Sequence, residues 1–393
     1  MKLAFLCDGL EPGANGLGDM VRHHVPYLRE RGVECLLLAM NDRAIREVES
    51  AAASPAHFGA PILRIPQHTG YAACTRLVRE RLARFQPDWL SLQFVSYGFA
   101  RKGIVLAEPF WMPRALGGFP LHVMMHELWV GHGVFRTPRT ALIGALQKRA
   151  VRFLLQRLRP SVVTTSCLYY ADLLRHIGID AHTIPLCGNV KVGDVVGGPW
   201  LDAALGTCGL DLSGHGRRNY WIFGLFGSLL RQWRPTTLFA RLASIARNQG
   251  RQAAVVCAGE TGRDNAALLA DWRRRHPEIL FGALGRRSEA ELSAFFNYID
   301  FGLTSHPHYT AGKSGSIAAM LEHGLPTITS WGFEEAPELA PIAGELGANL
   351  WRCDASLEAK LLAPPRRVRI YDGAGRMARH LLDELASASP RSA

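Results

Sequence analysis

Short apolar runs that alternate with helix-like segments are the feature that most constrains the fold of this chain. In the first half, helix-like stretches such as 19–31 and 139–158 separate the apolar runs LAFLCDG, ECLLLAM, PILRIP, WLSLQFV, LHVMMHEL, SVVTTSC and HTIPL. Strands that read as continuous apolar runs are buried on both faces, as in a parallel sheet covered by helices. The first half therefore predicts a doubly wound α/β domain.

The same alternation starts again in the second half, with the runs YWIFGLFGSLL, AAVVCAG, ILFGALG, FGLTSHP and PTIT. Between the halves, residues 188–219 are glycine-rich and weakly periodic, which indicates a linker region. A chain of 393 residues is too long for one typical core. We expect one Rossmann-like domain over 1–200 and a second over 215–372. A final helix and tail, 373–393, can pack on either domain, including back across a cleft between them.

The composition limits the classes of function. Hydrophobic residues make up 48% of the chain and charged residues 20%, which is typical of a soluble globular enzyme. The net charge of +11 suits anionic ligands such as nucleotide diphosphates, or the surface of an anionic membrane. Nucleic acid is disfavoured as a partner because the arginines are spread along the chain, without a zinc-finger spacing, an RNP motif or a basic repeat.

The eight cysteines form no CxxC pair, and several lie in apolar runs. They are therefore expected to be reduced thiols of a cytoplasmic protein. The apolar part of the N-terminus is too short for a signal peptide, and no stretch approaches the length of a membrane span. Any membrane contact is expected to be peripheral, at the inner face. The oligomeric state stays open.

Ligands of doubly wound sheets bind beyond the carboxyl ends of the strands, so the loops that follow the strands are the candidate sites. The first such loop, DGLEPGANGLGDM (8–20), contains Gly13, Gly16 and Gly18 and ends near Asp19. Its spacing is not GxGxxG, so a dinucleotide fingerprint is not supported. The glycines would let a substrate approach the backbone. The alternative is an ordinary turn between a strand and a helix.

His126 and Glu127 follow another apolar run, in MMHELWVGHG (124–133). The zinc motif HExxH would need its second histidine at position 130, which is Val130, so we reject a metal site. His126 is predicted to be an active-site hydrogen-bond donor or polarising group. The alternative is a half-buried histidine with a structural role.

Three loops of the second half contain candidate site residues. FGSLLRQWRP offers Gly227 and Ser228 with two arginines, Arg231 and Arg234, whose guanidinium groups fit phosphate oxygens. CAGETGRDN offers Gly259 and Glu260. The alternative for the arginines is that they cap their own loop at the surface.

The third loop precedes a helix-like stretch and reads GKSGS, from Gly312 to Ser316. A Walker phosphate loop would place a glycine where this chain has Pro307, so an NTPase site is not supported. The N–H groups of a helix N-terminus, together with Lys313, Ser314, Gly315 and Ser316, predict a more general anion site. The alternative is a capped helix whose lysine points to water.

Taken together, these loops resemble the GT-B glycosyltransferases, most closely glycosyltransferase family 4. The opening MKLAFLCDGLEPGANGLGD is similar to the family's first strand and glycine loop, and HVMMHEL is similar to the strand that ends in its active-site histidine. LFGSLLRQWRP stands where the family has GRL and a lysine, and GSIAAMLEHGLPTI is similar to its motif before GLPVI. The resemblance covers residues 1 to about 330.

The resemblance implies a GT-B fold, with two Rossmann-like domains that face an interdomain cleft. It implies transfer of a sugar from a nucleotide-sugar donor to an unidentified acceptor, with retention of configuration. The second domain would hold the donor diphosphate through Arg231, Arg234, Lys313 and residues 314–316, with Gly227, Ser228, Gly259 and Glu260 beside the nucleotide. The first would hold the acceptor near Gly16 and His126. These positive groups could stabilise the leaving diphosphate, so no metal and no cofactor besides the donor is expected.

The chain departs from the family at the two glutamates that contact donor sugar and ribose, where it has Ala311 and Ala319. The family's arginine and lysine are replaced by Ser228 and Trp233. Two alternatives therefore stay open. One is a catalytically silent GT-B protein that binds a nucleotide sugar or a partner. The other is a nucleotide-sugar epimerase, which needs carboxylate acid–base groups; the candidates are Asp19, Glu127 and Glu260.

Overall fold

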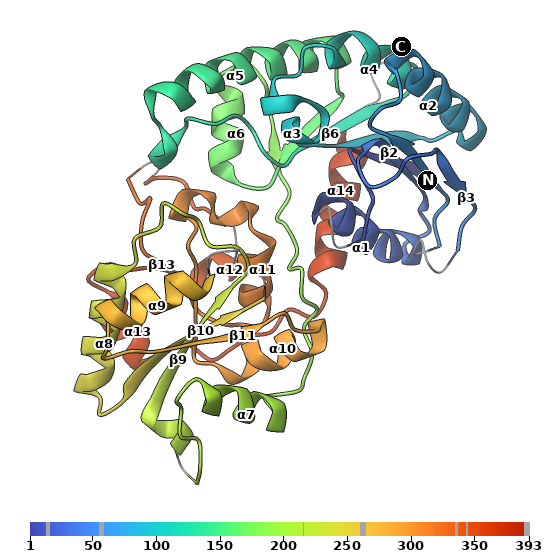
Figure 1. Ribbon diagram of the computed structural model, residues 1–393. Helices are drawn as coiled ribbons and strands as arrows, with labels where there is room; N and C mark the ends of the chain where they lie inside the picture. The colour runs from blue at the N-terminus through green and yellow to red at the C-terminus, as the bar shows by residue number, and fades with distance from the viewer. Residues whose placement is uncertain are drawn as a thin grey trace. The chain divides into compact units, whose positions relative to one another are not determined.

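The computed structural model describes residues 1–12, 16–54, 59–214, 216–259, 265–334, 337–342 and 345–388 (Figure 1). The chain divides into two compact units. The first contains Met1–Pro185 and Ala374–Ala393, and the second contains Leu186–Gly373. The C-terminal helix α14 (Gly373–Ser387) therefore belongs almost entirely to the first unit, where the Glu384 carboxylate lies 2.5 Å from His182 Nδ1.

The sheet of the first unit has the order β3-β4-β2-β1-β5-β6-β7-β8. All neighbours are parallel except β3 and β4. The central strands are almost fully buried, because helices cover them as expected for continuous apolar runs. The strands are β1 (Lys2–Cys7), β2 (Glu34–Asp42), β3 (Glu49–Ala51), β4 (Ile62–Pro66), β5 (Trp89–Phe94), β6 (Leu121–Met125), β7 (Val162–Thr165) and β8 (His182–Thr183).

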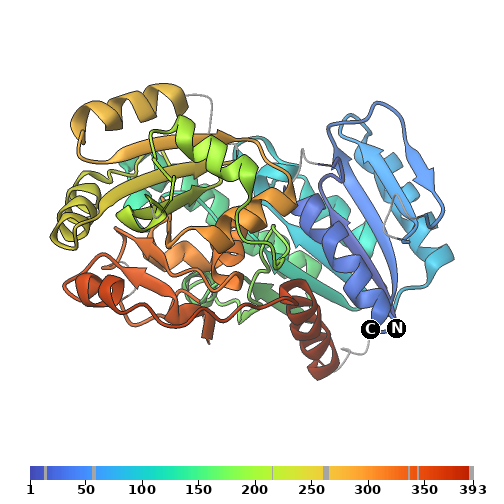
Figure 2. The same cartoon turned by 90° about the horizontal axis from the view of Figure 1, so that it is seen from below.

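The helices of the first unit bury one face each. In α1, Val21, Val25 and Leu28 recur at helical spacing and are buried, and Figure 2 shows this dark-blue helix running along the sheet. The longest helix, α5, starts at a capping box in which Thr140 N donates to Thr137 Oγ1. The helices are α1 (Gly16–Glu30), α2 (Tyr71–Phe85), α3 (Ser96–Phe99), α4 (Glu108–Leu116), α5 (Pro138–Leu158), α6 (Leu168–Arg175) and α14, with 3-10 turns at Arg101–Gly103 and Gly133–Phe135.

The second unit contains a parallel sheet in the order β11-β10-β9-β12-β13-β14. Its two faces bury separate clusters, one around Phe239 and Phe281 and the other around Phe295 and Phe296. The strands are β9 (Tyr220–Phe226), β10 (Gln252–Ala258), β11 (Leu280–Gly285), β12 (Phe301–Leu303), β13 (Thr327–Thr329) and β14 (Leu350–Arg352). The helices are α7 (Pro199–Thr207), α8 (Thr236–Asn248), α9 (Asn265–Arg275), α10 (Glu289–Tyr298), α11 (Gly315–Glu322), α12 (Glu345–Ala348) and α13 (Leu357–Leu362).

The two doubly wound α/β sheets predicted from the alternating pattern are confirmed. The linker expected over 188–219 is wrong at 199–207, which form helix α7. Leu201 and Leu205 of α7 are fully buried and pack in the same cluster as Phe295. The apolar residues of α7 repeat at helical spacing over little more than two turns, and glycines lie on both sides of them. The sequence analysis therefore missed this helix, because the glycine-rich flanks indicated a linker.

The strand expected over 301–307 ends at Leu303, and residues 308–313 form a 3-10 helix. The shorter strand brings Ser305 and His306 into the loop at the carboxyl end of the sheet.

Candidate functional site

In each sheet, the early strands are added on one side of the first strand, and the chain then returns to add the later strands on its other side. In the second unit the chain continues from β9 to β10 and β11 on one side, and then returns to place β12 on the other side of β9. In the first unit, β1 and β5 are the corresponding neighbours. The loops that follow such a pair of strands diverge and leave room for a ligand. The candidate residues are therefore described at these two positions, one in each unit.

In the second unit, the loop after β9 meets the first turn of α11. Gly227 has φ +83°, and a Cβ added to it would lie 2.5 Å from Ser316 Oγ. Only a glycine combines this backbone conformation with so close an approach. The structure thus brings together Gly227 and Ser316, two residues that the sequence assigned to one site although they are far apart along the chain.

Ser305 joins these loops from the end of β12. Its Oγ accepts a hydrogen bond from Leu230 N at 3.0 Å and lies 3.5 Å from the carbonyl oxygen of Ser228. Ser305 is almost fully buried, and its carbonyl oxygen accepts a hydrogen bond from Trp331 Nε1. Sequence reasoning missed Ser305 because it treated residues 301–307 as one strand.

The N-terminus of α11 has the geometry of a capped helix. Ser314 is the N-cap residue, and its Oγ accepts a hydrogen bond from Ile317 N at 3.3 Å. The N–H groups of Gly315 and Ser316 lie in the first turn, where no carbonyl of the same helix is available to them. The hydroxyl of Ser314 is thus used within the protein, whereas the first turn keeps its anion-binding character.

Lys313 ends the 3-10 helix that leads into α11 and is partly exposed. Burial and the positive charge of Lys313 lower the pKa of His306 to about 4, so His306 is neutral at pH 7. The Nδ1 atom of His306 is buried and has no hydrogen-bond partner in the described part of the chain. His306 is a second residue near this loop that the sequence did not indicate.

Arg231 and Arg234, which the sequence predicts to contact phosphate, are both exposed. Arg234 Nη1 donates to the carbonyl oxygens of Arg231 and Trp233, at 2.6 and 3.1 Å. Arg234 therefore caps its own loop in this structure. Trp233, which stands where the family has a lysine, is buried, and its Nε1 donates to Ser330 Oγ at 2.8 Å.

The two alanines that replace the family's glutamates, Ala311 and Ala319, are fully buried. Gly188 packs directly on α11: a Cβ added to Gly188 would lie only 2.6 Å from the Cα of Ala319. A glutamate at either position would have to displace its neighbours. Glu322, one turn further along α11, is also buried, and its carboxylate accepts a hydrogen bond from Gly188 N at 3.0 Å.

Gly259 follows β10 with φ +81°, and its N–H donates to the carbonyl oxygen of Gly285. A Cβ added to it would lie 3.2 Å from the Phe226 ring at the end of β9. Gly259 thus lies beside the strand that leads to Gly227. Glu260, predicted beside it, lies outside the described residues.

In the first unit, His126 directly follows β6 and its Nε2 lies 2.8 Å from Gln93 Oε1 of β5. A series of hydrogen bonds continues from Gln93 through the sheet to β7. Its remaining members are Gln93 Nε2 to Ser91 Oγ (2.7 Å), Ser91 Oγ to His122 Nδ1 (2.9 Å), His122 Nε2 to Thr164 Oγ1 (2.7 Å) and Thr164 Oγ1 to Met124 Sδ (2.9 Å).

The thioether at the end fixes the direction of this hydrogen-bond series. Met124 Sδ has no proton, so Thr164 donates to it and must accept from His122 Nε2–H. His122 Nδ1 then accepts from Ser91, Ser91 accepts from the Gln93 amide, and the Gln93 carbonyl oxygen accepts from His126 Nε2–H. His126 is therefore held as the tautomer whose Nδ1 is a hydrogen-bond acceptor.

Burial keeps these histidines neutral. Burial, together with the nearby rings of His24 and His122, lowers the pKa of His126 to about 3. Burial alone lowers the pKa of His122 to about 3. The partner of His126 in the series is an amide, which stabilises a charged ring far less than a carboxylate would. At pH 7 the ring accepts or donates hydrogen bonds but carries no charge.

Glu127, the residue after His126, is exposed. Within the described residues, no group of three or more histidine, cysteine, aspartate or glutamate side chains could hold a metal ion.

His24 of α1 is a further buried histidine that sequence reasoning missed. It is almost completely buried, and burial lowers its pKa to about 4. Within the described residues its Nε2 has no hydrogen-bond partner. The sequence signal was its spacing, three residues after Val21 and four before Leu28, which places His24 on the apolar face of the helix.

The glycine loop after β1 passes over the start of α1. A Cβ added to Gly18 would lie 2.5 Å from the carbonyl oxygen of Gly9, so this crossing requires glycine. Gly16, by contrast, is exposed, and among the described residues no atom lies within 4 Å of an added Cβ. Asp19 forms an ion pair with Arg22, which also donates to the carbonyl oxygen of Leu10. Gly13 lies outside the described residues.

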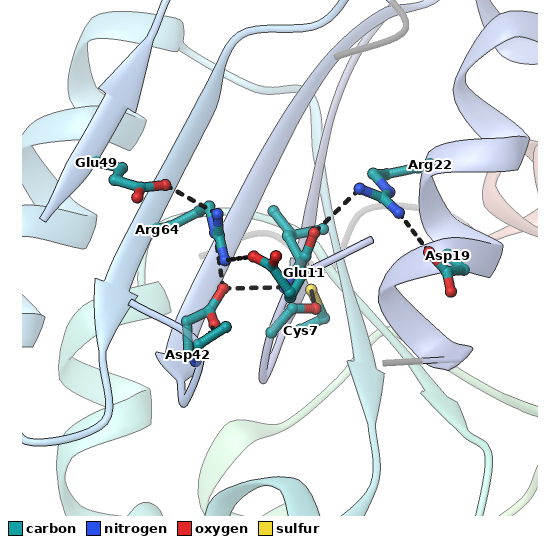
Figure 3. A network of polar contacts seen from close by, with 10 residues as sticks. Cys7, Glu11, Asp19, Arg22, Asp42, Glu49 and Arg64 are labelled. Atoms are coloured by element: carbon teal, nitrogen blue, oxygen red, sulfur yellow. Dashed lines mark hydrogen bonds and ion pairs between the residues drawn. The ribbon is translucent and has the colours of Figure 1, made fainter. Parts of the chain in front are cut away.

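An arginine-centred network anchors the same loop, as Figure 3 shows. Arg64 of β4 pairs with Asp42 (2.8 Å), Glu11 (2.6 Å) and Glu49 (2.9 Å). Asp42 Oδ2 also accepts a hydrogen bond from Leu10 N at 3.1 Å. Burial raises the pKa of Asp42, but hydrogen bonds from Arg64 and from the backbone N–H groups of Ala44 and Leu10, together with the charge of Arg64, more than offset this. The net pKa is therefore below its ordinary value.

No protein-family profile and no curated protein sequence matches this chain. Solved structures do match it. HepE from Anabaena, in complex with UDP and glucose, aligns over 98% of this chain and 100% of its own with 14% identity and a TM-score of 0.55. The lipopolysaccharide outer core galactosyltransferase WaaB, in its apo form, aligns over 98% of this chain and 99% of its own, with 13% identity and a TM-score of 0.55.

A putative UDP-N-acetylglucosamine 2-epimerase from Listeria monocytogenes also matches, over 98% of this chain and 96% of its own, with 12% identity and a TM-score of 0.50. At these identities the likeness concerns the fold. The chain has the GT-B fold of two Rossmann-like domains, as its sequence motifs indicated.

Replacing Arg64 by methionine should destabilise the first unit by about 3–5 kcal/mol, because the buried carboxylate of Asp42 then lacks its positive partner. Adding Asp42→Asn should recover much of this loss. Arg76→Met removes an exposed ion pair with Glu80 and should cost at most about 0.5 kcal/mol. Denaturant unfolding of the full chain measures all three. Equal stability of the Arg64 and Arg76 variants would contradict the anchoring role.

The melting temperature should fall as the pH is lowered from about 7.5 to about 5. The pKa values of His24 and His122 are about 4 and 3 in the folded protein, against 6.5 for an ordinary histidine, so the unfolded chain binds more protons in this range. Each histidine can cost up to about 2 kcal/mol at pH 5. Calorimetry of the wild type and of His122→Gln checks this, since the variant should show a weaker pH dependence. An equal dependence in both proteins would contradict burial as the cause.

Nitrogen-15 NMR of the histidine rings should show the Nε2–H tautomer for both His126 and His122. In Gln93→Leu, His126 should lose this preference because its carbonyl acceptor is gone. His122 should keep it, because Thr164 and Met124 still set its direction, and it serves as the internal control. The opposite tautomer of His122 in the wild type would show that the direction of the series is wrong.

Proposed function

We propose that this protein is a glycosyltransferase that moves a sugar from a nucleotide-sugar donor to an acceptor. The observation that carries the proposal is the approach of Gly227 to Ser316 where β9 and β12 part, which puts a glycine loop beside the N-terminus of α11. Such a position suits a diphosphate, because backbone N–H groups can reach its oxygens. The GT-B fold shared with WaaB supports the assignment of the reaction.

The second unit would hold the donor. The first turn of α11 supplies backbone N–H groups at Gly315 and Ser316 for the diphosphate oxygens. Lys313 and the exposed Arg231 would add full positive charges, and Arg234 would have to turn away from the carbonyls that it caps. As the bond to the sugar breaks, negative charge grows on the diphosphate, and positive groups already in place stabilise it.

No metal and no cofactor besides the donor is part of this proposal, because Lys313 and Arg231 can supply the positive charge that the leaving diphosphate needs. His306 would add a neutral hydrogen-bonding group beside Lys313. We also propose that Gly227, Ser228 and Gly259 let the nucleotide approach the backbone.

The first unit would hold the acceptor. The uncharged His126 has Nε2–H engaged by Gln93, so its Nδ1 can accept a hydrogen bond from a hydroxyl of the acceptor. A neutral ring of this kind orients a hydroxyl but does not act as an imidazolium acid at pH 7. Gly16 and Asp19 would lie on the acceptor side, and retention of configuration belongs to the proposal through the family resemblance.

Epimerase activity is the weaker alternative, although one protein of this fold carries that putative assignment. Epimerisation needs carboxylates as acid and base. Of the candidates, Asp19 is paired with Arg22 and Glu127 is exposed.

The second alternative is a catalytically silent protein. It is favoured by the buried Ala311 and Ala319, and turnover of any donor would exclude it.

A cytoplasmic location is part of the proposal, since nucleotide sugars are its donors. None of the eight cysteines forms a disulfide, and most are buried, which suits a reducing compartment. No helix in the described part of the chain is long and apolar enough to cross a membrane.

Lys313→Ala and Arg231→Ala should each weaken nucleoside diphosphate binding about tenfold or more, because each removes a charged contact to phosphate. Thermal shift titrations with UDP, ADP, GDP and their sugars measure this. Lys191→Ala, an exposed lysine of the same unit, is the matched control and should bind as the wild type does. Unchanged affinity in both site variants would remove the phosphate site.

A further inference from the structure

The longest helix of the first unit carries an unusual charge pattern. Residues 128–171 contain no aspartate or glutamate, although the chain has 34 acidic residues. The same stretch contains seven basic residues: Arg136, Arg139, Lys148, Arg149, Arg152, Arg157 and Arg159. Most of them belong to α5, which Figure 1 shows as a long green helix. This part of the surface is therefore far more basic than the average of the chain.

Large apolar side chains lie exposed on the same helix. The exposed fractions are 67% for Leu142, 44% for Leu146 and 42% for Phe153. Their spacing, with Arg149 between them, places these residues on one face of α5. The opposite face, with Val151 and Leu154, is buried in the unit. The outer apolar residues therefore have no role in the core.

Helix α4 extends this surface. Phe110 of α4 is 53% exposed, and its ring contacts that of Phe153 edge-on, with 5.9 Å between centroids. We call the set Phe110, Leu142, Leu146, Arg149, Arg152 and Phe153 the α5 face. It combines a continuous apolar strip with exposed arginines and contains no negative charge.

We propose that the α5 face binds the surface of an anionic lipid bilayer. Apolar side chains can enter the boundary between headgroups and acyl chains, while the arginines meet lipid phosphates. A second copy of this chain fits less well, because a two-fold contact would set arginine against arginine. Nucleic acid would leave the leucines without a partner. The proposal is independent of sugar transfer.

The test is sedimentation of the full chain with vesicles, without donor or acceptor. Vesicles of phosphatidylglycerol and phosphatidylcholine are compared with pure phosphatidylcholine. We expect binding to the anionic vesicles only, with loss of binding at high salt. Arg149→Glu/Arg152→Glu should weaken binding roughly tenfold or more. Leu142→Ser/Leu146→Ser should weaken it as well, because less apolar surface enters the bilayer.

Two matched controls keep the proposal falsifiable. Arg46→Glu/Arg247→Glu makes the same change of charge at exposed positions elsewhere, and Val195→Ser/Val196→Ser removes exposed apolar groups from the second unit. Both should bind as the wild type does. No binding to anionic vesicles, equal loss in controls and test variants, or preference for RNA or self-association through the α5 face would overturn the proposal.

Discussion

The approach of Gly227 to Ser316 is the constraint on which the account of the second unit depends. Parallel strands end at one edge of their sheet, and the chain leaves β9 and β12 in different directions. A glycine at φ +83° lets the loop after β9 lie against the first turn of α11. The sheet, and not local sequence, thus brings the glycine loop to the helix N-terminus.

The first unit uses buried polar groups in a different way. Five hydrogen bonds connect His126 to Met124 across β5, β6 and β7, and the thioether at the end allows one direction of donation. Burial keeps the rings neutral, so the series can fix a tautomer without a charge. Arg64 has a comparable role at the glycine loop, where it holds Asp42 and Glu11.

The sequence predicted the two sheets because apolar strand runs are a local signal. It also indicated Gly227 and His126, which follow strands, and Ser316, which begins a helix; all three lie in segments similar to family motifs. It missed Gln93 and His122, because the register in which β5 pairs with β6 brings them into the hydrogen-bond series, and a local sequence pattern does not show that register. It missed helix α7, whose short apolar pattern stands among glycines. Arg234 shows the limit of motif reasoning, since its guanidinium binds carbonyls of its own loop.

The most direct test of the central claim is hydrogen–deuterium exchange of the full chain with and without UDP. The account predicts slower exchange at residues 227–230 and 314–317 when the nucleotide is bound, since these two segments contain the backbone groups proposed to face the diphosphate. Slower exchange elsewhere, with these two segments unchanged at saturating nucleotide, would contradict it.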